Sequence, residues 1–127
     1  MRAYRCRRVR PGLFAVACLV LTLGAHAGNL HAQEAKKFTL INVIFDGTKV
    51  WLPSSLMVHE GDTVELTLIN KLDGPHGFQL AAFGIEEVAQ PKAQSTVRFT
   101  ATKTGVHPFV CQMHPPHIGG QVLVLKK

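Results

Sequence analysis

Residues 63–69 read T-V-E-L-T-L-I, an alternation of polar and apolar side chains that is typical of a half-buried β-strand. Val64, Leu66 and Leu68 share one face of this strand, so that face is expected to pack on a core. The chain has no convincing helical window apart from one turn expected within residues 84–93. The sequence therefore predicts an all-β protein.

Short apolar and β-branched segments flank this strand on both sides, and glycine, proline and polar clusters separate them. One of them places His76, Phe78 and Leu80 on the same face, so His76 begins on the core side. Residues 56–59 are either a further short strand or the approach to a turn. About seven strands, with turn signals about every 8 to 12 residues, predict a β-sandwich. These strands are expected at 38–45, 49–52, 63–69, 76–80, 97–101, 106–111 and 121–125.

The N-terminal segment contains the three parts of a secretory signal peptide in their usual order. Five arginines lie within residues 2–10, an apolar run covers Leu13–Leu23, and Ala25-His26-Ala27 is a small-residue cleavage pattern. The apolar run is shorter than the roughly 20 residues that a membrane-spanning helix needs, and no second run follows. We therefore expect a periplasmic protein whose mature form has no transmembrane segment.

The cleavage site sets the boundaries of the mature protein. A second small-residue pattern ends at Ala32, so the mature chain is expected to begin between Gly28 and Gln33. A domain of the remaining size can bury one core without disulfides. The expected parts are a signal peptide over 1–27, a disordered mature N-terminus over 28–36 and one domain over 37–127.

Removal of the leader changes both the charge and the cysteine content. Five of the 14 Lys and Arg residues lie in the leader, which leaves nine against eight Asp and Glu. The mature chain is thus almost neutral, and it lacks the basic stripe that nucleic-acid binding requires. Cys6 and Cys18 also leave, so Cys111 is the single mature cysteine and no intramolecular disulfide can form.

This cysteine begins the segment Cys111-Gln112-Met113-His114-Pro115-Pro116-His117. A thiolate beside imidazoles suits copper or zinc. The Cys-x2-His spacing at the end of a strand lets the chain curl so that both side chains meet one ion, and the two prolines stiffen the loop. We therefore expect Cys111, His114 and His117 to bind a metal, together with His76, which opens a core-facing strand after a long loop.

Several of these segments resemble the cupredoxin family of small copper proteins. The resemblance covers about Phe38 to the C-terminus and is carried by residues 58–64, Asn70, His76 and the Cys111-x2-His114 loop. The chain is most similar to nitrosocyanin-type red copper proteins at residues 77–84, 87–88, 99–101 and 111–115. The resemblance implies a Greek-key β-sandwich with one copper ion at one end, held by His76, Cys111, His114 and His117. It also implies that Asn70 pins the ligand loop by hydrogen bonds, although a strand-end turn is an equally good role for this residue.

Two positions depart from the patterns that the chain resembles. His76 stands where nitrosocyanin-type proteins have a copper-binding glutamate, as it does in ordinary blue copper proteins. His117 stands where the short amicyanin-like loop closes with an axial methionine. Met113 lies between Cys111 and His114 and is expected to be a packing residue rather than the missing axial ligand.

A site with one cysteine and three histidines favours a one-electron carrier that cycles between Cu(I) and Cu(II) and serves a redox partner protein of unknown identity. No substrate pocket is evident in the sequence, which favours electron transfer over enzymatic activity. One alternative is a nitrosocyanin-like site that binds or transforms a small molecule such as nitric oxide, and another is a periplasmic copper carrier or storage protein. A structural zinc site is the remaining alternative, although copper has the higher intrinsic affinity.

Overall fold

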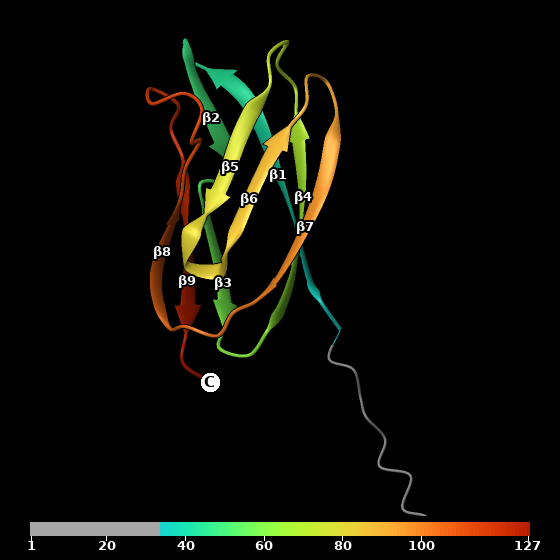
Figure 1. Cartoon of the computed structure of the whole chain (residues 1–127). Coiled ribbons are helices and arrows are strands. Elements are labelled where there is room, and N and C mark those ends of the chain that lie inside the picture. Colours follow the sequence, from blue (N-terminus) through green and yellow to red (C-terminus); the bar gives the residue numbers. More distant parts are fainter. Residues whose placement is uncertain (1–33) are drawn as a thin grey trace, which may run out of the picture. The chain divides into compact units, whose positions relative to one another are not determined.

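The structure, a computed structural model, describes residues 34–127. The predicted signal peptide and residues 28–33 of the predicted disordered segment lie outside the described residues. Nine strands and one 3-10 turn make up the described part (Figure 1). They are β1 (Lys36–Phe45), β2 (Thr48–Leu52), β3 (Ser55–His59), β4 (Thr63–Asn70), β5 (His76–Leu80), η1 (Ala81–Phe83), β6 (Ile85–Ala89), β7 (Gln94–Thr100), β8 (Gly105–Phe109) and β9 (Gly120–Leu125).

The strands form a four-stranded sheet, a three-stranded sheet and a hairpin. Their orders are β2-β1-β4-β7, β3-β9-β8 and β5-β6. β1 runs parallel to β4, and β3 runs parallel to β9, whereas the other neighbours are antiparallel. Two isolated bridges, Gln79 with Val110 and Val50 with Ile118, tie the two ends of the loop from β8 to β9 to other strands. That loop is therefore anchored on both sides.

The inward faces of the strands build one hydrophobic core. Its largest fully buried side chains are Trp51, Phe78 and Phe109. Phe78 lies at the centre of this group, with its ring centroid 5.8 Å from that of Trp51 and 5.1 Å from that of Phe109. Each fully buried large apolar side chain contributes about 1.5 to 3 kcal/mol relative to an exposed one, so this core stabilises the sandwich without a metal.

The prediction of an all-β sandwich is confirmed. The alternating side chains Val64, Leu66 and Leu68 of β4 are fully buried, as the pattern indicated. The described residues contain nine strands rather than about seven, because residues 55–59 form a strand and Ile85–Ala89 pairs with β5. The helical turn expected within 84–93 is wrong, since the 3-10 turn lies before it and residues 85–89 are extended.

Three features of the chain meet at one end of the sandwich, the end away from the C-terminus in Figure 1. β5 starts there, β8 ends there, and the loop from β8 to β9 lies at the same end, beside β2. This is where the predicted site residues lie. Within residues 34–127, no helix is long and apolar enough to cross a membrane.

Candidate metal centre

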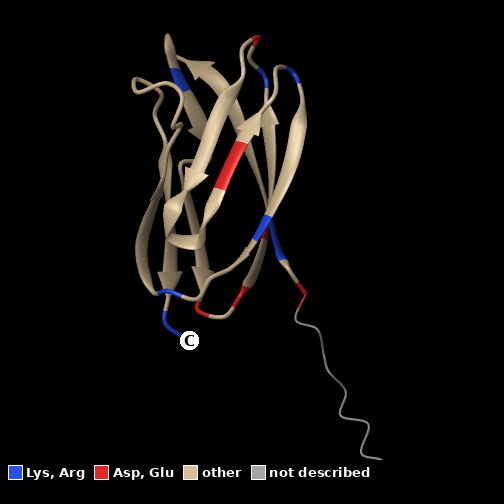
Figure 2. Cartoon of the chain, viewed as in Figure 1, with Lys and Arg blue, Asp and Glu red and all other residues tan. Residues whose placement is uncertain are grey.

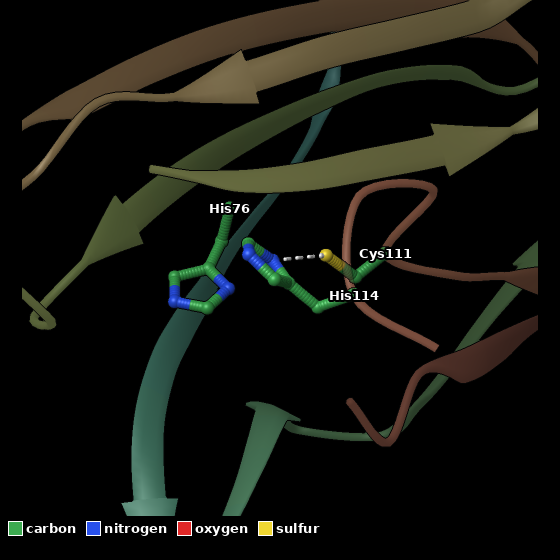
Figure 3. A group of neighbouring side chains, drawn as sticks. All are labelled: His76, Cys111 and His114. Carbon is green, nitrogen blue, oxygen red and sulfur yellow. Dashed lines mark hydrogen bonds between the residues drawn. The ribbon is translucent and has the colours of Figure 1, made fainter. Parts of the chain in front are cut away.

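His76, Cys111 and His114 lie together at this end of the sandwich, and their side chains face one another (Figure 3). Each offers one ligand atom, and these three atoms all lie within 4.8 Å of one another. Nitrogen and sulfur ligands lie about 2.0 to 2.3 Å from a bound transition metal, so a group of this size can hold one ion. His76 is 2% exposed and Cys111 is 6% exposed, whereas His114 is half-buried.

The position of His76 follows from the loop that precedes it. Asn70 ends β4, and its side-chain Nδ2 donates to the Gly74 carbonyl at 2.8 Å and to the Ala89 carbonyl at 3.0 Å. Its Oδ1 accepts from the Leu72 N–H at 3.0 Å. Because Ala89 is the register partner of His76, one amide side chain holds both the loop and the strand beside His76. Asn70 thus supports the loop before β5, rather than contacting the loop from β8 to β9 directly.

The sulfur of Cys111 receives a hydrogen bond from the backbone. The Gly77 N–H lies 3.2 Å from Cys111 Sγ, and the carbonyl of the same Gly77 accepts from Trp51 Nε1 at 3.2 Å. A hydrogen bond from an N–H group stabilises negative charge on the sulfur, which is the form that binds metals. A Cβ atom at Gly77 would meet the far end of the Gln112 side chain, which would have to move to make room for it.

The ring of His114 lies between the thiol and His76. Its Nδ1 is 3.6 Å from Cys111 Sγ, and its ring centroid is 4.7 Å from that of His76. The turn that follows is closed by the His117 N–H, which donates to the His114 carbonyl at 3.0 Å. The two intervening prolines restrict this turn, so His114 and His117 are presented from one short rigid segment.

His117 lies next to this three-residue group without being part of it. Its ring centroid is 5.2 Å from that of His76 and 6.1 Å from that of Trp51, and the residue is 6% exposed. Its Nε2 is 2.8 Å from Oδ1 of Asn42. The structure therefore brings together His76, Cys111 and His114, and it places the ring of the fourth predicted ligand, His117, next to that of His76.

Both buried histidines are biased toward the neutral form. Burial lowers the pKa of His117 to about 4, and the neighbouring His76 acts in the same direction. Burial also lowers the pKa of His76, as do the charges of His114 and Lys49. Neutral imidazole is the form that binds metals, so the site favours metal-competent histidines.

The hydrogen-bonding state of these residues fits a transition metal. Within residues 34–127, Nδ1 of His76 and Nδ1 of His117 are buried and have no hydrogen-bond partner. A buried polar atom without a partner costs about 1 to 3 kcal/mol, so it needs an explanation such as an ion. A soft sulfur with imidazole nitrogens is a donor set that copper accepts. The residues present therefore fit copper.

Asn42 is a site residue that the sequence analysis missed. It is fully buried, and it contacts both His117 and Asn70 through its side chain. A signal was present in the sequence, because Phe38, Leu40 and Asn42 alternate along β1 and a polar side chain thus stands in an inward position. Buried amides are rare unless they are hydrogen-bonded, so this position indicated a polar partner.

His114 reaches the surface between two clefts. One has a volume of about 340 Å³ and is lined by Gly47, Thr48, Lys49, Met113, His114, Pro115, Pro116 and His117. The other, of about 270 Å³, includes Lys49, Asp73, His76 and His114 in its lining. Exposed apolar side chains lie in the same loop as His114, since Met113 is 41% exposed and Ile118 54%, whereas Lys49 and Asp73 bring charge to the clefts. The loop from β8 to β9 carries no Lys, Arg, Asp or Glu (Figure 2).

Comparison with known proteins agrees with this fold. The sequence matches the cupredoxin-like domain family over residues 13–124. A copper nitrite reductase from Nitrosomonas europaea superposes with a TM-score of 0.64 at 24% identity, over 74% of this chain and 42% of that one. A Cu-containing nitrite reductase from Thermus scotoductus gives 0.62 at 25% identity, over 74% of this chain and 28% of that one.

A third solved protein is similar at lower identity. A blue copper oxidase from Nitrosomonas europaea superposes with a TM-score of 0.62 at 17% identity, over 74% of this chain and 40% of that one. The chain thus spans less than half of the length of each of these three proteins. No curated protein matches its sequence.

Proposed function

Because the chain belongs to the cupredoxin family, we propose that it is a mononuclear copper protein that carries single electrons. The supporting observation is the group of His76, Cys111 and His114, whose ligand atoms lie within 4.8 Å of one another at one end of the sandwich. The chain is similar to solved proteins that are described as copper enzymes, but it spans only part of each. Their reactions are therefore not assigned to it.

Four side chains would hold the ion. His76, Cys111 and His114 are the principal ligands, and His117 is the fourth, through the Nδ1 atom that lacks a hydrogen-bond partner among the described residues. When bound, copper supplies a centre that alternates between Cu(I) and Cu(II) and so exchanges one electron at a time. The sulfur of Cys111 is the soft donor that favours copper among divalent metals of similar size.

The chain itself limits how much the site can rearrange. His76 and Cys111 are almost fully buried, which keeps water away from them. Hydrogen bonds from Asn70 fix the loop before His76, and the Gly77 N–H fixes the sulfur. Ligands that are held in place by packing and hydrogen bonds keep one geometry, which suits a centre that must change charge without changing shape.

His114 is the residue through which an electron would pass to a partner. It is half-buried and lies beside exposed apolar side chains such as Met113 and Ile118. Weak encounters between redox proteins use small interfaces, which bury less than about 1,200 Å² in total, and the exposed apolar side chains beside His114 offer a surface for such an encounter. A redox partner protein that docks over His114 is therefore part of the proposal.

We place this activity in the periplasm. The support is the signal-peptide pattern in residues 1–27, which lies outside the described part of the chain. Intact mass of the protein recovered from a periplasmic fraction tests this placement. A mature start between Gly28 and Gln33 is expected, and a membrane-bound product that retains residues 1–27 would contradict it.

The copper proposal is tested with the processed protein loaded with one equivalent of Cu(II). Optical and electron paramagnetic resonance spectra should show a bound copper with a thiolate charge-transfer band, and voltammetry should show a reversible one-electron wave. A protein that binds no copper, prefers zinc or holds redox-silent copper would contradict the proposal. Rapid loss of copper to a competing chelator would instead indicate a copper carrier.

Binding of a small molecule is a second candidate function, favoured by the cleft of about 340 Å³ next to His114 and His117. Thr48 and Lys49 also line this cleft, and they could hydrogen-bond a small oxide such as nitric oxide or an anion. Titration of the copper form with azide and with nitric oxide separates the two functions. A saturable change in the spectrum favours ligand binding, and an unchanged spectrum favours electron transfer alone.

A further inference from the structure

Three buried polar side chains form a chain of hydrogen bonds beneath the candidate metal centre. They are Asn70 on β4, Asn42 on β1 and His117 on the loop before β9. The two asparagines are register partners in the parallel pair β1 and β4, and both are fully buried. Inside a protein, such a chain is stable only when every donor meets an acceptor, so its directions can be worked out from one end.

Asn70 has its orientation set by the backbone. Its Nδ2 lies 2.8 Å from the Gly74 carbonyl and 3.0 Å from the Ala89 carbonyl, and both carbonyls can only accept. Both N–H bonds of the amide are thereby used. Its Oδ1 must then be the acceptor for the Leu72 N–H at 3.0 Å and for the Asn42 side chain at 3.3 Å.

The orientation of Asn42 follows from that of Asn70. Because Asn70 presents an oxygen, Asn42 must present its Nδ2 there, and its Oδ1 then faces Nε2 of His117 at 2.8 Å. An amide oxygen only accepts, so a hydrogen bond at this distance requires that Nε2 carries the proton. In neutral imidazole the other nitrogen, Nδ1, then has the lone pair. This Nδ1 is buried and has no hydrogen-bond partner within residues 34–127.

We propose that Asn42 is a positioning residue, oriented by Asn70, that holds His117 in its Nε2–H form and leaves the Nδ1 lone pair for the metal. This assignment rests on the proposed function for the role of the metal, but the tautomer is a property of the metal-free protein. Groups that hydrogen-bond the outer nitrogen of a ligating histidine fix its ring orientation and raise its donor strength. Asn42 therefore tunes His117 without touching the ion.

Nitrogen-15 spectra of the metal-free protein at pH 7 test the tautomer directly. In the wild type, Nε2 of His117 should appear as protonated and Nδ1 as unprotonated, with a slowly exchanging Nε2–H. In Asn42→Leu, this proton should exchange at least tenfold faster and the two nitrogens should move toward averaged shifts. Asn42→Asp keeps an acceptor opposite Nε2, so Nε2 should stay protonated, although the variant loses the donor to Asn70 Oδ1 and should be less stable. Thr39→Val, on the exposed face of the same strand, is the matched control.

The reduction potentials of the copper-loaded variants give a second readout. A purely structural role of Asn42 would not predict which variant has the higher potential. Asn42→Leu weakens His117 as a donor and should raise the potential, whereas Asn42→Asp should leave it unchanged or lower it. A protonated Nδ1 in the wild type, or a Leu variant with wild-type exchange and potential, would overturn the role of Asn42. If the protein binds no copper but shows the expected tautomer, the proposed function fails and the assignment of His117 stands.

Discussion

The backbone N–H of Gly77 lies 3.2 Å from the sulfur of Cys111, although the two residues are 34 positions apart in the chain. This bond connects the strand that carries His76 with the loop that carries Cys111 and His114. The Gly77 carbonyl in turn accepts from Trp51 in the core. Hydrogen bonds therefore connect the candidate metal centre to the core of the sandwich. A substitution at Trp51 in the core is expected to alter the surroundings of the Cys111 sulfur.

Trp51→Phe tests this continuity. The change keeps an aromatic ring in the core but removes the donor to the Gly77 carbonyl, so stability should fall by about 1 to 3 kcal/mol. Urea unfolding of the metal-free protein measures the loss. Phe78→Leu, which touches the same ring without a hydrogen bond to Gly77, serves as the control. Only the Trp51 change should also shift the absorption of the copper form.

Cys111→Ser should remove the intense visible band of the copper form and leave the fold intact. The serine hydroxyl can still accept from the Gly77 N–H, so we expect a change in metal-free stability of about 1 kcal/mol or less. Met113→Leu, in the same loop, should retain the band because Met113 is largely exposed. Strong visible absorption in the serine variant would remove Cys111 from the site.

His117→Met should raise the reduction potential and move the intense band to longer wavelength. An imidazole is a stronger donor to Cu(II) than a thioether, so its loss favours Cu(I). For a one-electron couple, a tenfold change in relative affinity corresponds to about 59 mV, and we expect a rise of at least this size. His107→Met, whose ring packs on Phe83 away from the site, should change neither property. An unchanged potential in His117→Met would show that His117 is not a ligand.

The metal-free protein should lose stability in mild acid. The folded pKa of His117 is lowered to about 4 from 6.5, so the unfolded chain takes up this proton first as the pH falls. The contribution of neutral His117 to the free energy of unfolding is fully present above pH 6.5, declines as the pH falls below that value and is lost near pH 4. It amounts to at most about 3 kcal/mol. Urea unfolding between pH 7.5 and 4 measures it.

His117→Gln provides the comparison for this pH dependence, because glutamine can still donate to Asn42 but does not titrate in this range. Its stability should fall less steeply below pH 6.5 than that of the wild type. His76, whose pKa is also lowered by burial, should account for part of the remaining slope. Equal slopes in the two proteins would mean that His117 is not held in its neutral form.

Much of the fold could be predicted because one face of each strand is buried. The alternation in β4 and in the start of β5 placed Val64, Leu66, Leu68, Phe78 and Leu80 in the core, where the structure has them. Residues 85–89 escaped prediction because adjacent Glu86 and Glu87 break the alternation, and it is pairing with β5 that makes them extended. The local pattern of side chains does not predict a strand whose extended conformation depends on pairing with another strand.

Some residues of the candidate site could likewise be predicted from the sequence, and others could not. Cys111 and His114 are close in sequence, so a short loop could be expected to bring them together. His76 could be placed by strand parity, which put it on the inward face. Asn42 and Gly77 could not be assigned partners, because their contacts join residues 75 and 34 positions apart. Such contacts depend on how the sheets pack against each other, and the residues near Asn42 or Gly77 in the sequence do not indicate that packing.

The parallel pairing of β1 with β4 has a consequence for folding. Asn42 lies opposite Asn70, and successive side chains of a strand point to opposite faces. A slip of β1 by one residue would turn Asn42 outward and set Ile41 or Val43 against the buried amide of Asn70. A slip by two would keep the faces but put Leu40 or Ile44 there, and each unpaired amide would cost about 1 to 3 kcal/mol. The hydrogen bond between the two asparagines therefore favours one alignment of the two strands, whether or not an ion is bound.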